Sequence, residues 1–281
     1  MVLEKMGISQ QESRTPEQLE KHYEIEKDLA RRLKHSNRHQ RAVLYNEIYK
    51  ELYRKVPEVF SKTNLSSLSR DISTQLKILK PFINEKTTFL EVGPGDCKLS
   101  FEVSKYVKRV VATDVLGEVA TSVVWPLNFM LIVSDGLSIG VQKSIVDVAF
   151  SNQVIEHVHP DDIAVQVKNI YEALVPGGVY ICITPHRFSG PHDISKYFDE
   201  VASGLHLKEY TYTELSNMFK EAGFLKIYAL VGAIGVYVPI PLKPLVFLET
   251  VLEIMPKAIK RALSHTLILR LFLGIKVVAR K

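Results

Sequence analysis

Cysteine is scarce in this sequence, and an apolar leader segment is missing. Its two cysteines, Cys97 and Cys182, both lie in apolar, strand-like surroundings. Two cysteines cannot supply a disulfide framework, which excludes the class of small disulfide-stapled secreted domains. Residues 1–20 also lack the apolar core of a signal peptide. We therefore expect a protein of a reducing compartment, located in the cytoplasm.

The chain has no strong excess of charge of either sign. Its 36 basic and 31 acidic residues give a net charge of +5, which permits an acidic partner or a membrane surface but requires neither. The basic run Arg31-Arg32-Leu33-Lys34-His35 is offset by the acids Glu24, Glu26 and Asp28. We interpret the run as the solvated face of a helix, so nucleic acid is not the expected partner.

The uncharged stretch over residues 227–242 does not have the pattern of a membrane span. Gly232, Gly235, Pro239 and Pro241 interrupt it, and such residues argue against a membrane-spanning helix. A strand is expected where the stretch begins, over Phe224–Val231.

From Thr87 onward, short apolar runs alternate with helical stretches. This alternation indicates an α/β fold, with a Rossmann-like, doubly wound and mostly parallel sheet of seven strands. The helices between strands are expected at Lys98–Tyr106, Leu116–Trp125 and Asp161–Leu174. The strands are expected at Thr88–Val92, Arg109–Thr113, Phe129–Val133, Ile145–Phe150, Val179–Thr184, Phe224–Val231 and Leu271–Ala279.

The residues before the first strand predict helices. One is expected over residues 16–55, broken near Ser36-Asn37 and carrying a stripe of tyrosines in its second half, and another over Ser66–Lys80. We assign residues 1–82 to an N-terminal helical extension. Two interpretations are open: a cap over an active site, or helices that only pack against the main domain.

The main domain is expected over residues 83–281, with a helix at Thr213–Ala222 and a helical insertion at about 240–268. Residues 244–273 combine apolar residues at helical spacing with the cations Lys257, Lys260 and Arg261. That combination suits a helix lying in a membrane interface, so peripheral membrane contact is one hypothesis. The alternative is that the apolar stripe covers the sheet or a partner subunit.

The strongest chemical signal is a glycine-rich turn after the first strand. The run Glu91-Val92-Gly93-Pro94-Gly95 ends a buried strand, and glycines there let a ligand approach the backbone closely. A dinucleotide-binding turn would carry a third glycine where Lys98 stands. The carboxylate of Glu91 suits a cationic or amine-bearing ligand better than a pyrophosphate.

Acids follow the next two predicted strands in the same position. Asp114 comes roughly 20 residues after the glycine turn, where a carboxylate can bind both hydroxyls of a ribose. Its alternative role is a helix N-cap. Asp135 precedes Gly136 and is placed to accept a hydrogen bond from an adenine amine. Three acids after three successive strands favour a nucleoside-bearing ligand.

Together with two further runs, these residues resemble the class I S-adenosylmethionine-dependent methyltransferases. The similarity is to the broad type 11 subgroup that includes the ubiquinone-biosynthesis O-methyltransferases. It covers residues 86–185 and, more weakly, residues 205–230. The further runs are Asp147-Val148-Ala149-Phe150-Ser151-Asn152-Gln153-Val154-Ile155-Glu156-His157-Val158 and Leu174-Val175-Pro176-Gly177-Gly178-Val179.

The resemblance implies S-adenosyl-L-methionine as the cofactor. It implies methyl transfer, expected as O-methylation, to a small molecule or to a glycan- or lipid-linked acceptor. The residues that it implies contact the cofactor are Glu91, Gly93, Gly95, Asp114, Val115, Asp135, Gly136, Asn152 and Gln153.

A metal is not expected. In some relatives, including small-RNA 2′-O-methyltransferases, a Glu-x-x-Glu-His sequence binds a divalent cation. The corresponding residues here are Gln153, Glu156 and His157, so a neutral amide replaces the first carboxylate. A hard cation such as Mg²⁺ prefers charged oxygen ligands. The sequence therefore predicts activity that survives chelation.

Two histidines are the candidate catalytic residues. His157 and His186 could each act as a general base near neutral pH, which a hydroxyl acceptor would need and a carboxylate acceptor would not. The alternative for His157 is a hydrogen-bonded structural residue beside the cofactor. Further candidates for the acceptor site are His192, Asp193 and His206, each of which could also be an ordinary loop residue.

Two other functions compete with methyl transfer. One is a nucleotide-dependent oxidoreductase on a similar fold, and the missing third glycine and Glu91 count against it. The other is a non-catalytic binding module that retained the fold, and the full set of acids and glycines counts against that.

Overall fold

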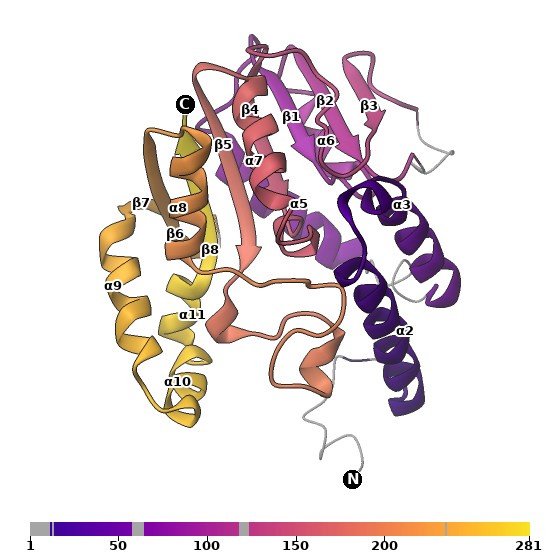
Figure 1. Cartoon of the computed structure of the whole chain (residues 1–281). Coiled ribbons are helices and arrows are strands. Elements are labelled where there is room, and N and C mark those ends of the chain that lie inside the picture. Colours follow the sequence, from indigo (N-terminus) through magenta and orange to yellow (C-terminus); the bar gives the residue numbers. More distant parts are fainter. Residues whose placement is uncertain (1–11, 13, 58–64, 118–123, 234) are drawn as a thin grey trace.

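The computed structural model describes residue 12 and residues 14–57, 65–117, 124–233 and 235–281. Within them, helices cover both faces of a central sheet, and two N-terminal helices stand beside one of its ends (Figure 1). The sheet has the strand order β3-β2-β1-β4-β5-β8-β6-β7. Its strands are β1 Thr88–Val92, β2 Arg109–Asp114, β3 Phe129–Val133, β4 Val146–Asn152, β5 Leu174–Pro185, β6 Lys226–Ala233, β7 Val236–Pro241 and β8 Gly274–Arg280.

Most of the sheet is parallel. Strands β3, β2, β1, β4 and β5 pair in parallel, while β8 lies antiparallel to both β5 and β6. The carboxyl ends of the parallel strands therefore meet at one edge, which is where ligands of open α/β sheets bind. The predicted doubly wound, mostly parallel architecture is confirmed.

The sheet has eight strands, one more than the sequence predicted. The extra strand is β7, which pairs antiparallel with β6 through a turn at Gly232 and Gly235. A Cβ on Gly232 would lie 2.0 Å from the carbonyl oxygen of Val236, so this hairpin requires glycine there. The uncharged stretch over 227–242 therefore folds back on itself.

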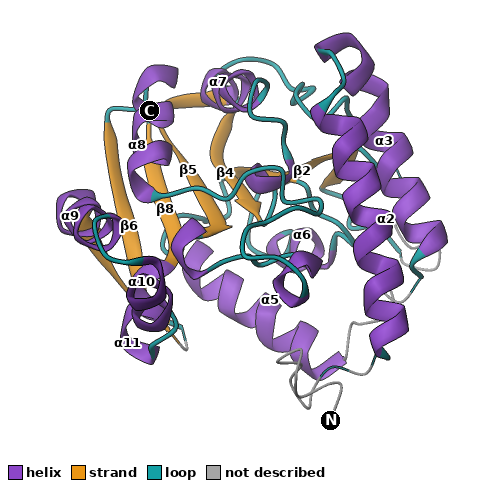
Figure 2. Cartoon of the chain, turned by 60° about the horizontal axis from the view of Figure 1, so that its bottom comes forward, coloured by secondary structure: helices purple, strands orange, loops and turns teal. Residues whose placement is uncertain are grey.

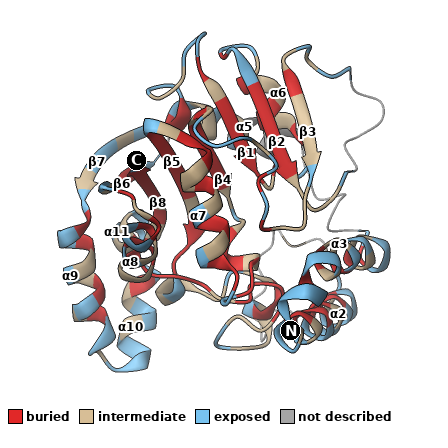
Figure 3. Cartoon of the chain, turned by 45° about the horizontal axis from the view of Figure 1, so that its top comes forward, coloured by how far each residue is buried: buried red, intermediate tan, exposed pale blue. Residues whose placement is uncertain are grey.

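Helices on the two faces of the sheet close two apolar cores. On one face, α5 (Leu65–Leu79) and α6 (Lys98–Val103) pack on the strands; on the other, α7 (Ile163–Ala173) and α8 (Tyr212–Ala222) do so. Figure 3 shows the buried residues gathered on the central strands. The predicted helix at Leu116–Trp125 falls largely outside the described residues.

Three short helices replace the single amphipathic helix expected near the C-terminus. They are α9 (Leu242–Glu253), α10 (Lys257–Ser264) and α11 (Leu267–Leu273). Pro256 precedes α10, and Thr266 caps α11 by accepting a hydrogen bond from the backbone of Leu269. The breaks follow from these residues, because proline cannot continue a helix and threonine favours a helix start.

The N-terminal helices divide between two locations. Helices α2 (Pro16–Lys34) and α3 (Arg38–Lys55) form a pair that is broken at Ser36 and Asn37, as predicted. They pack on the loop that contains Leu205 and Leu207, beside the carboxyl ends of the strands (Figure 2). Helix α5 instead belongs to the core of the sheet.

A buried ion pair fastens α3 to the main domain. The Arg41 guanidinium donates to both carboxylate oxygens of Asp162, at 2.5 and 2.9 Å, and both side chains are almost completely buried. The hydroxyl of Tyr45 also accepts a hydrogen bond from the backbone of His159, at 2.8 Å. These contacts therefore fix the position of helix α3 relative to the main domain.

Candidate active site

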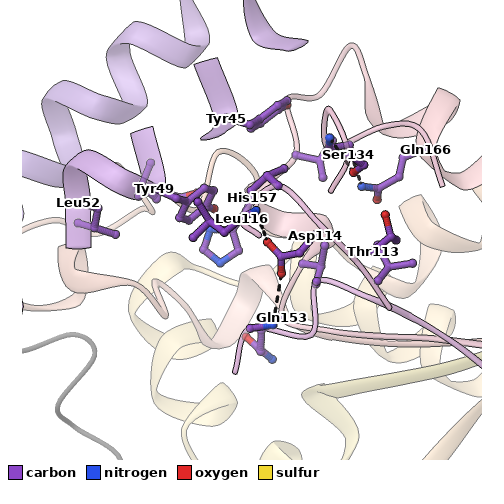
Figure 4. Close-up of a pocket in the computed structure, with 18 of the residues that line it drawn as sticks. Tyr45, Tyr49, Leu52, Thr113, Asp114, Leu116, Ser134, Gln153, His157 and Gln166 are labelled. Carbon is purple, nitrogen blue, oxygen red and sulfur yellow. Dashed lines mark hydrogen bonds between the residues drawn. The ribbon is translucent and has the colours of Figure 1, made fainter. Parts of the chain in front are cut away.

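A cavity of about 330 Å³ opens at the carboxyl ends of β1, β2, β3 and β4. In Figure 4, side chains from α3 form one wall, and residues that follow the strands form the other. The residues that line it are Glu26, Tyr45, Tyr49, Leu52, Tyr53, Val92, Gly93, Gly95, Thr113, Asp114, Val115, Leu116, Ser134, Gly136, Ser138, Ile139, Gln153, Val154, His157, Val158, Gln166 and Leu205.

The glycine turn lines this cavity with backbone. Gly93 and Gly95 both have positive φ, +67° and +56°. A Cβ on Gly93 would lie 2.5 Å from a methyl carbon of Val154, whereas a Cβ on Gly95 would meet no atom within 4 Å. Gly95 therefore leaves open space beside the turn, and a ligand can lie against its backbone.

Asp114 also lines the cavity, at the end of β2. Its carboxylate accepts hydrogen bonds from the backbone of Gly95, at 3.3 Å, and of Leu116, at 2.9 Å. Burial raises the pKa of Asp114 above its usual value. The hydroxyl of the neighbouring Thr113 is buried without a hydrogen-bond partner in the described structure. Both groups are available to a polar ligand.

Glu91 lies beneath the cavity rather than in its wall. Its side chain is buried and accepts a hydrogen bond from the hydroxyl of Ser100, at 2.5 Å. Burial raises the pKa of Glu91 to about 7. Glu91, which was predicted to contact the ligand, therefore joins β1 to α6 and does not line the cavity.

The third acid is also turned away from the cavity. Asp135 accepts hydrogen bonds from the backbone of Leu137, at 2.9 Å, and of Ser138, at 2.7 Å, so its carboxylate holds its own turn together. Its neighbours Ser134 and Gly136 line the cavity in its place. Aspartate side chains often form hydrogen bonds with the backbone of their own turn, and a carboxylate held in this way is not directed at a ligand.

The two predicted cofactor residues at the end of β4 differ in whether they line the cavity. Gln153 lines the cavity, with a positive φ of 56°, and Asn152 does not. Val115 lines it too, and its carbonyl oxygen accepts a hydrogen bond from Asn46 of α3. The predicted cofactor residues that reach the cavity are Gly93, Gly95, Asp114, Val115, Gly136 and Gln153.

The comparisons with known proteins agree with this geometry. Residues 90–182 match the family model of a methyltransferase domain. Among curated proteins, no sequence matches the chain. The fold is similar to that of 1,6-didemethyltoxoflavin-N1-methyltransferase from Burkholderia thailandensis, solved with 1,6-didemethyltoxoflavin and S-adenosylhomocysteine, at 15% identity and a TM-score of 0.54 over 88% of this chain and 91% of that one.

Residues 90–182 form a methyltransferase domain, and the chain has the fold of S-adenosylmethionine-dependent methyltransferases. Two other structures share the fold. A structure from Haloferax volcanii, of a methyltransferase activator in complex with a methyltransferase, is 14% identical with a TM-score of 0.56, covering 79% of this chain and 94% of that one. A methyltransferase from Mesorhizobium loti is 14% identical with a TM-score of 0.50, covering 75% of this chain and 100% of that one.

The strand-end wall fits S-adenosylmethionine, whose demethylated form, S-adenosylhomocysteine, is bound in the Burkholderia thailandensis structure. The open space at Gly95, the carboxylate of Asp114 and the unpartnered hydroxyl of Thr113 can receive a ligand that carries a ribose and amines. Several aromatic residues from α3 face this wall, and these were predicted only as a stripe of tyrosines. They are Tyr45, Tyr49 and Tyr53.

Replacing Asp114 by alanine is expected to weaken cofactor binding roughly tenfold or more, because a buried, charge-assisted hydrogen bond contributes about 1.5–3 kcal/mol. Calorimetric titration of S-adenosylmethionine measures the loss, which should shrink with a ribose-deoxygenated analogue. Asp96→Ala is the control, since Asp96 is an acid of the glycine turn after β1 and does not line the cavity. An equal loss for both ligands would show that Asp114 does not bind the ribose.

His157 lines the cavity, between the strand-end wall and α3. Its Nδ1 lies 3.0 Å from the carbonyl oxygen of Leu205, and its ring meets those of Tyr49 and His206 edge to face. Burial, reinforced by the neighbouring His206, lowers the pKa of His157 to about 3. The ring is therefore neutral at physiological pH, and it lines the cavity.

His186 is not in the active site, contrary to the sequence prediction. Its side chain is fully buried away from the cavity. Its Nε2 donates to a carboxylate oxygen of Glu249 at 2.8 Å, and its Nδ1 accepts from the backbone of Phe188 at 3.1 Å. Both ring nitrogens are thus engaged, so His186 ties β5 to α9 and has no free nitrogen to act as a base.

The loop residues named as acceptor candidates also form a structural network. Asp193 accepts hydrogen bonds from the backbone of Ser195 and Gly204. Glu209 contacts His192 and His206, at 3.2 and 2.9 Å. Among them, His206 is the one that reaches His157.

The cavity-lining residues that sequence reasoning missed include Glu26, Gln166 and Leu205. Glu26 of α2 accepts a hydrogen bond from the backbone of Leu205 at 3.1 Å, and Gln166 of α7 donates to the carbonyl oxygen of Gly136 at 2.6 Å. Glu26 and Gln166 lie on the buried faces of helices, and Leu205 lies in a loop, so no local motif marks any of them.

Proposed function

We propose that this methyltransferase transfers the methyl group of S-adenosylmethionine to a hydroxyl oxygen of an acceptor that enters beneath α3. The acceptor is a small molecule or the polar part of a glycan- or lipid-linked molecule. The observation that carries this proposal is the composition of the wall opposite the cofactor residues. Three tyrosines and a neutral histidine line it, Tyr45, Tyr49, Tyr53 and His157.

This wall suits a ring-bearing acceptor with hydroxyl groups. Aromatic faces give apolar contact, and a few convergent polar groups fix orientation, as in most small-molecule sites. The Nδ1 of His157 faces a carbonyl oxygen and therefore carries the hydrogen. Its Nε2 is left with a lone pair that can accept a hydrogen bond from an acceptor hydroxyl and hold it in place.

The residues of the chain supply binding and alignment. Bound S-adenosylmethionine provides an electrophilic methyl group whose sulfur leaves as a neutral thioether, so the chemistry resides in the cofactor. Gly93, Gly95 and Asp114 would hold it, and His157 would orient the oxygen that forms the new carbon–oxygen bond. The hydroxyl proton is released to solvent. Fixing both partners in line is the main contribution of the protein.

Helices α2 and α3 act as a cap in this proposal. Helix α3 supplies the aromatic wall, and Asn46 and Tyr45 join it to the strand-end loops. Residues 83–281 then form the catalytic domain, and the N-terminal helices close the acceptor side of the site.

Labelled S-adenosylmethionine tests the proposed function. The purified protein is incubated with fractions of a cell extract, and the product that acquires label is identified by mass spectrometry. We expect a methyl ether, stable to mild base. Label on nitrogen or carbon would overturn O-methylation, and no label in any fraction would argue against the acceptor classes named.

The C-terminal helices support a lipid-linked acceptor. They expose several large apolar side chains next to cations, and α10 packs beside the turn at Arg187–Ser189 that follows β5. None of the described helices is long and apolar enough to cross a membrane. The apolar residues that they expose are Phe247, Ile254, Ile259, Leu267, Ile268 and Leu271.

A protein with this surface is expected to float with vesicles that contain anionic lipid, and to dissociate as salt rises. Neutralising three cations should weaken binding roughly 100-fold, since each contributes about 1 kcal/mol near an anionic surface. The cations are Lys257, Lys260 and Arg261. Liposome flotation makes the measurement.

The matched control neutralises three exposed cations at the opposite end of the sheet, Lys105, Lys108 and Arg109. It changes the net charge equally and should leave flotation unchanged. A protein that stays in the soluble fraction at low salt would leave α9–α11 as a cover for the sheet or for a partner subunit.

A further inference from the structure

Three side chains at the acceptor end of the cavity form a separate cluster. We propose that Glu156, His157 and His206 bind one divalent transition-metal cation, such as Zn²⁺. The ligand atoms of the three residues all lie within 4.8 Å of one another. Metal binding itself is independent of the proposed function, and only its catalytic use rests on that function.

Two elements bring the cluster together. Glu156 and His157 belong to η1 (Ile155–His157), the short turn that follows β4. His206 comes from the loop under α2 and α3, and the backbone of Lys208 in the same loop donates to the carbonyl oxygen of Glu156 at 3.2 Å. The imidazole rings of His157 and His206 lie 4.8 Å apart and nearly perpendicular.

Glu156 supplies the observation that points to a cation. Its side chain is fully buried. One carboxylate oxygen, Oε2, accepts a hydrogen bond from the Thr184 hydroxyl at 2.8 Å, and the other, Oε1, has no hydrogen-bond partner in the described structure. A buried carboxylate oxygen without a partner is costly. A cation bound at this oxygen removes that cost.

Both histidines are held in the form that binds metals. The Nδ1 of His157 faces the carbonyl oxygen of Leu205 at 3.0 Å, and the Nδ1 of His206 faces the carboxylate of Glu209 at 2.9 Å. Each Nδ1 therefore carries a hydrogen, and each Nε2 is left with a lone pair. Metal-binding histidines almost always donate their other ring nitrogen to a carbonyl or carboxylate in this way.

The ligand set selects the class of metal. Two imidazoles and one carboxylate suit zinc and similar transition metals, whereas Mg²⁺ favours oxygen ligands. The neutral Gln153 is consistent with this preference, since it is not a charged oxygen ligand. The sequence predicted activity without a metal from residues 153–157 alone. The fold brings a third ligand, His206, next to Glu156 and His157.

Three protein ligands leave a coordination position open, as in catalytic zinc sites. His157 lines the cavity, so the open position is accessible from the acceptor side. A hydroxyl oxygen of the acceptor is the ligand class that fits there. In the metal-bound protein the Nε2 of His157 is a metal ligand, so the metal holds the acceptor hydroxyl, and the hydrogen bond from that hydroxyl to Nε2 belongs to the metal-free protein. A metal-bound hydroxyl loses its proton more readily, which would supply the activation that a methyl transfer to oxygen requires.

The test measures metal binding without cofactor or acceptor. The full chain is stripped with a chelator, dialysed and titrated with Zn²⁺ by calorimetry, and the metal content is measured by elemental analysis. We expect about one Zn²⁺ per chain, as for a single three-ligand site. Glu156→Gln and His206→Ala should each weaken binding at least roughly 100-fold, and Glu209→Gln roughly 10–100-fold.

His159→Asn is the matched control. His159 is buried two residues from His157, is not part of the cluster, and accepts a backbone hydrogen bond that asparagine can also accept. This variant should bind Zn²⁺ like the unaltered protein. Thermal unfolding of the stripped variants shows whether they are folded, and Glu156→Gln should unfold no earlier than the stripped parent.

Two results would overturn the metal site: no saturable Zn²⁺ binding by the unaltered chain, or unchanged binding by folded His206→Ala. Failure of the proposed function is distinguishable. Methyl transfer to nitrogen, with the zinc stoichiometry intact, would remove O-methylation and leave the metal site standing.

Discussion

Replacing Gly95 by valine is expected to abolish S-adenosylmethionine binding while the protein stays folded. Gly95 has a φ of +56°, and a Cβ there would meet no protein atom within 4 Å. The added side chain therefore enters the open space at the glycine turn, where the cofactor is expected to lie. We expect a loss in affinity of at least about 100-fold, which corresponds to roughly 2.7 kcal/mol.

Gly177→Val is the control for Gly95→Val. Gly177 also has a positive φ, +79°, and open space around its Cβ position, but it lies outside the cofactor cavity. Both variants should lose about 1–2 kcal/mol of stability from the left-handed backbone conformation. Calorimetric titration should then show binding lost in Gly95→Val and retained in Gly177→Val. Retained affinity in both would place the cofactor elsewhere.

Gly93 is a less informative position for the same experiment. A Cβ there would lie 2.5 Å from Val154, so a substitution would displace a neighbouring side chain as well as the ligand. Loss of binding could then arise from a disturbed wall. Gly95 separates the two effects.

Replacing Arg41 by alanine is expected to destabilise the protein by about 3–5 kcal/mol, because it leaves the buried carboxylate of Asp162 without its cation. The exposed fractions of the two side chains are 4% and 1%, so little solvent can compensate. The guanidinium also donates to the carbonyl oxygen of Ser36, so the start of α3 loses a partner as well. Chemical denaturation followed by circular dichroism measures the loss.

The double variant Arg41→Met, Asp162→Leu tests the cause. Exchange of a buried ion pair for apolar side chains of similar size is often neutral, so most of the stability should return. A loss below about 1 kcal/mol in Arg41→Ala would mean that the pair behaves like an exposed salt bridge. Helix α3 would then depend on its apolar contacts and on the hydrogen bonds of Tyr45 and Asn46.

The cofactor side of the site could be predicted because its signals are local. Gly93, Gly95 and Asp114 sit directly after buried strands, and parallel strands bring their carboxyl ends to one edge of the sheet. Hydrophobic periodicity located those strands, so the residues that follow them were located too. The resemblance to known methyltransferases indicated Gly136, Gln153 and His157 as well, and all three line the cavity.

Prediction from the sequence failed where the side chain forms hydrogen bonds within its own turn or with a residue far along the chain. Asp135 has the correct position in the chain, but the backbone of its own turn holds its carboxylate. His186 also follows a strand, yet Glu249 of α9 draws it into the core. Neither outcome can be read from spacing, because each depends on the geometry of a loop or on a helix far along the chain.

The sequence by itself determined the strands other than β7, the glycine turn and the acid that ends β2, because these depend on short-range pattern and on the rule that parallel strands end together. The tertiary structure decided which side chains face the acceptor. It brought Tyr49 of α3 and His206 of a distant loop against His157. Contacts between segments so far apart depend on how helices pack on the finished sheet, which no local pattern specifies.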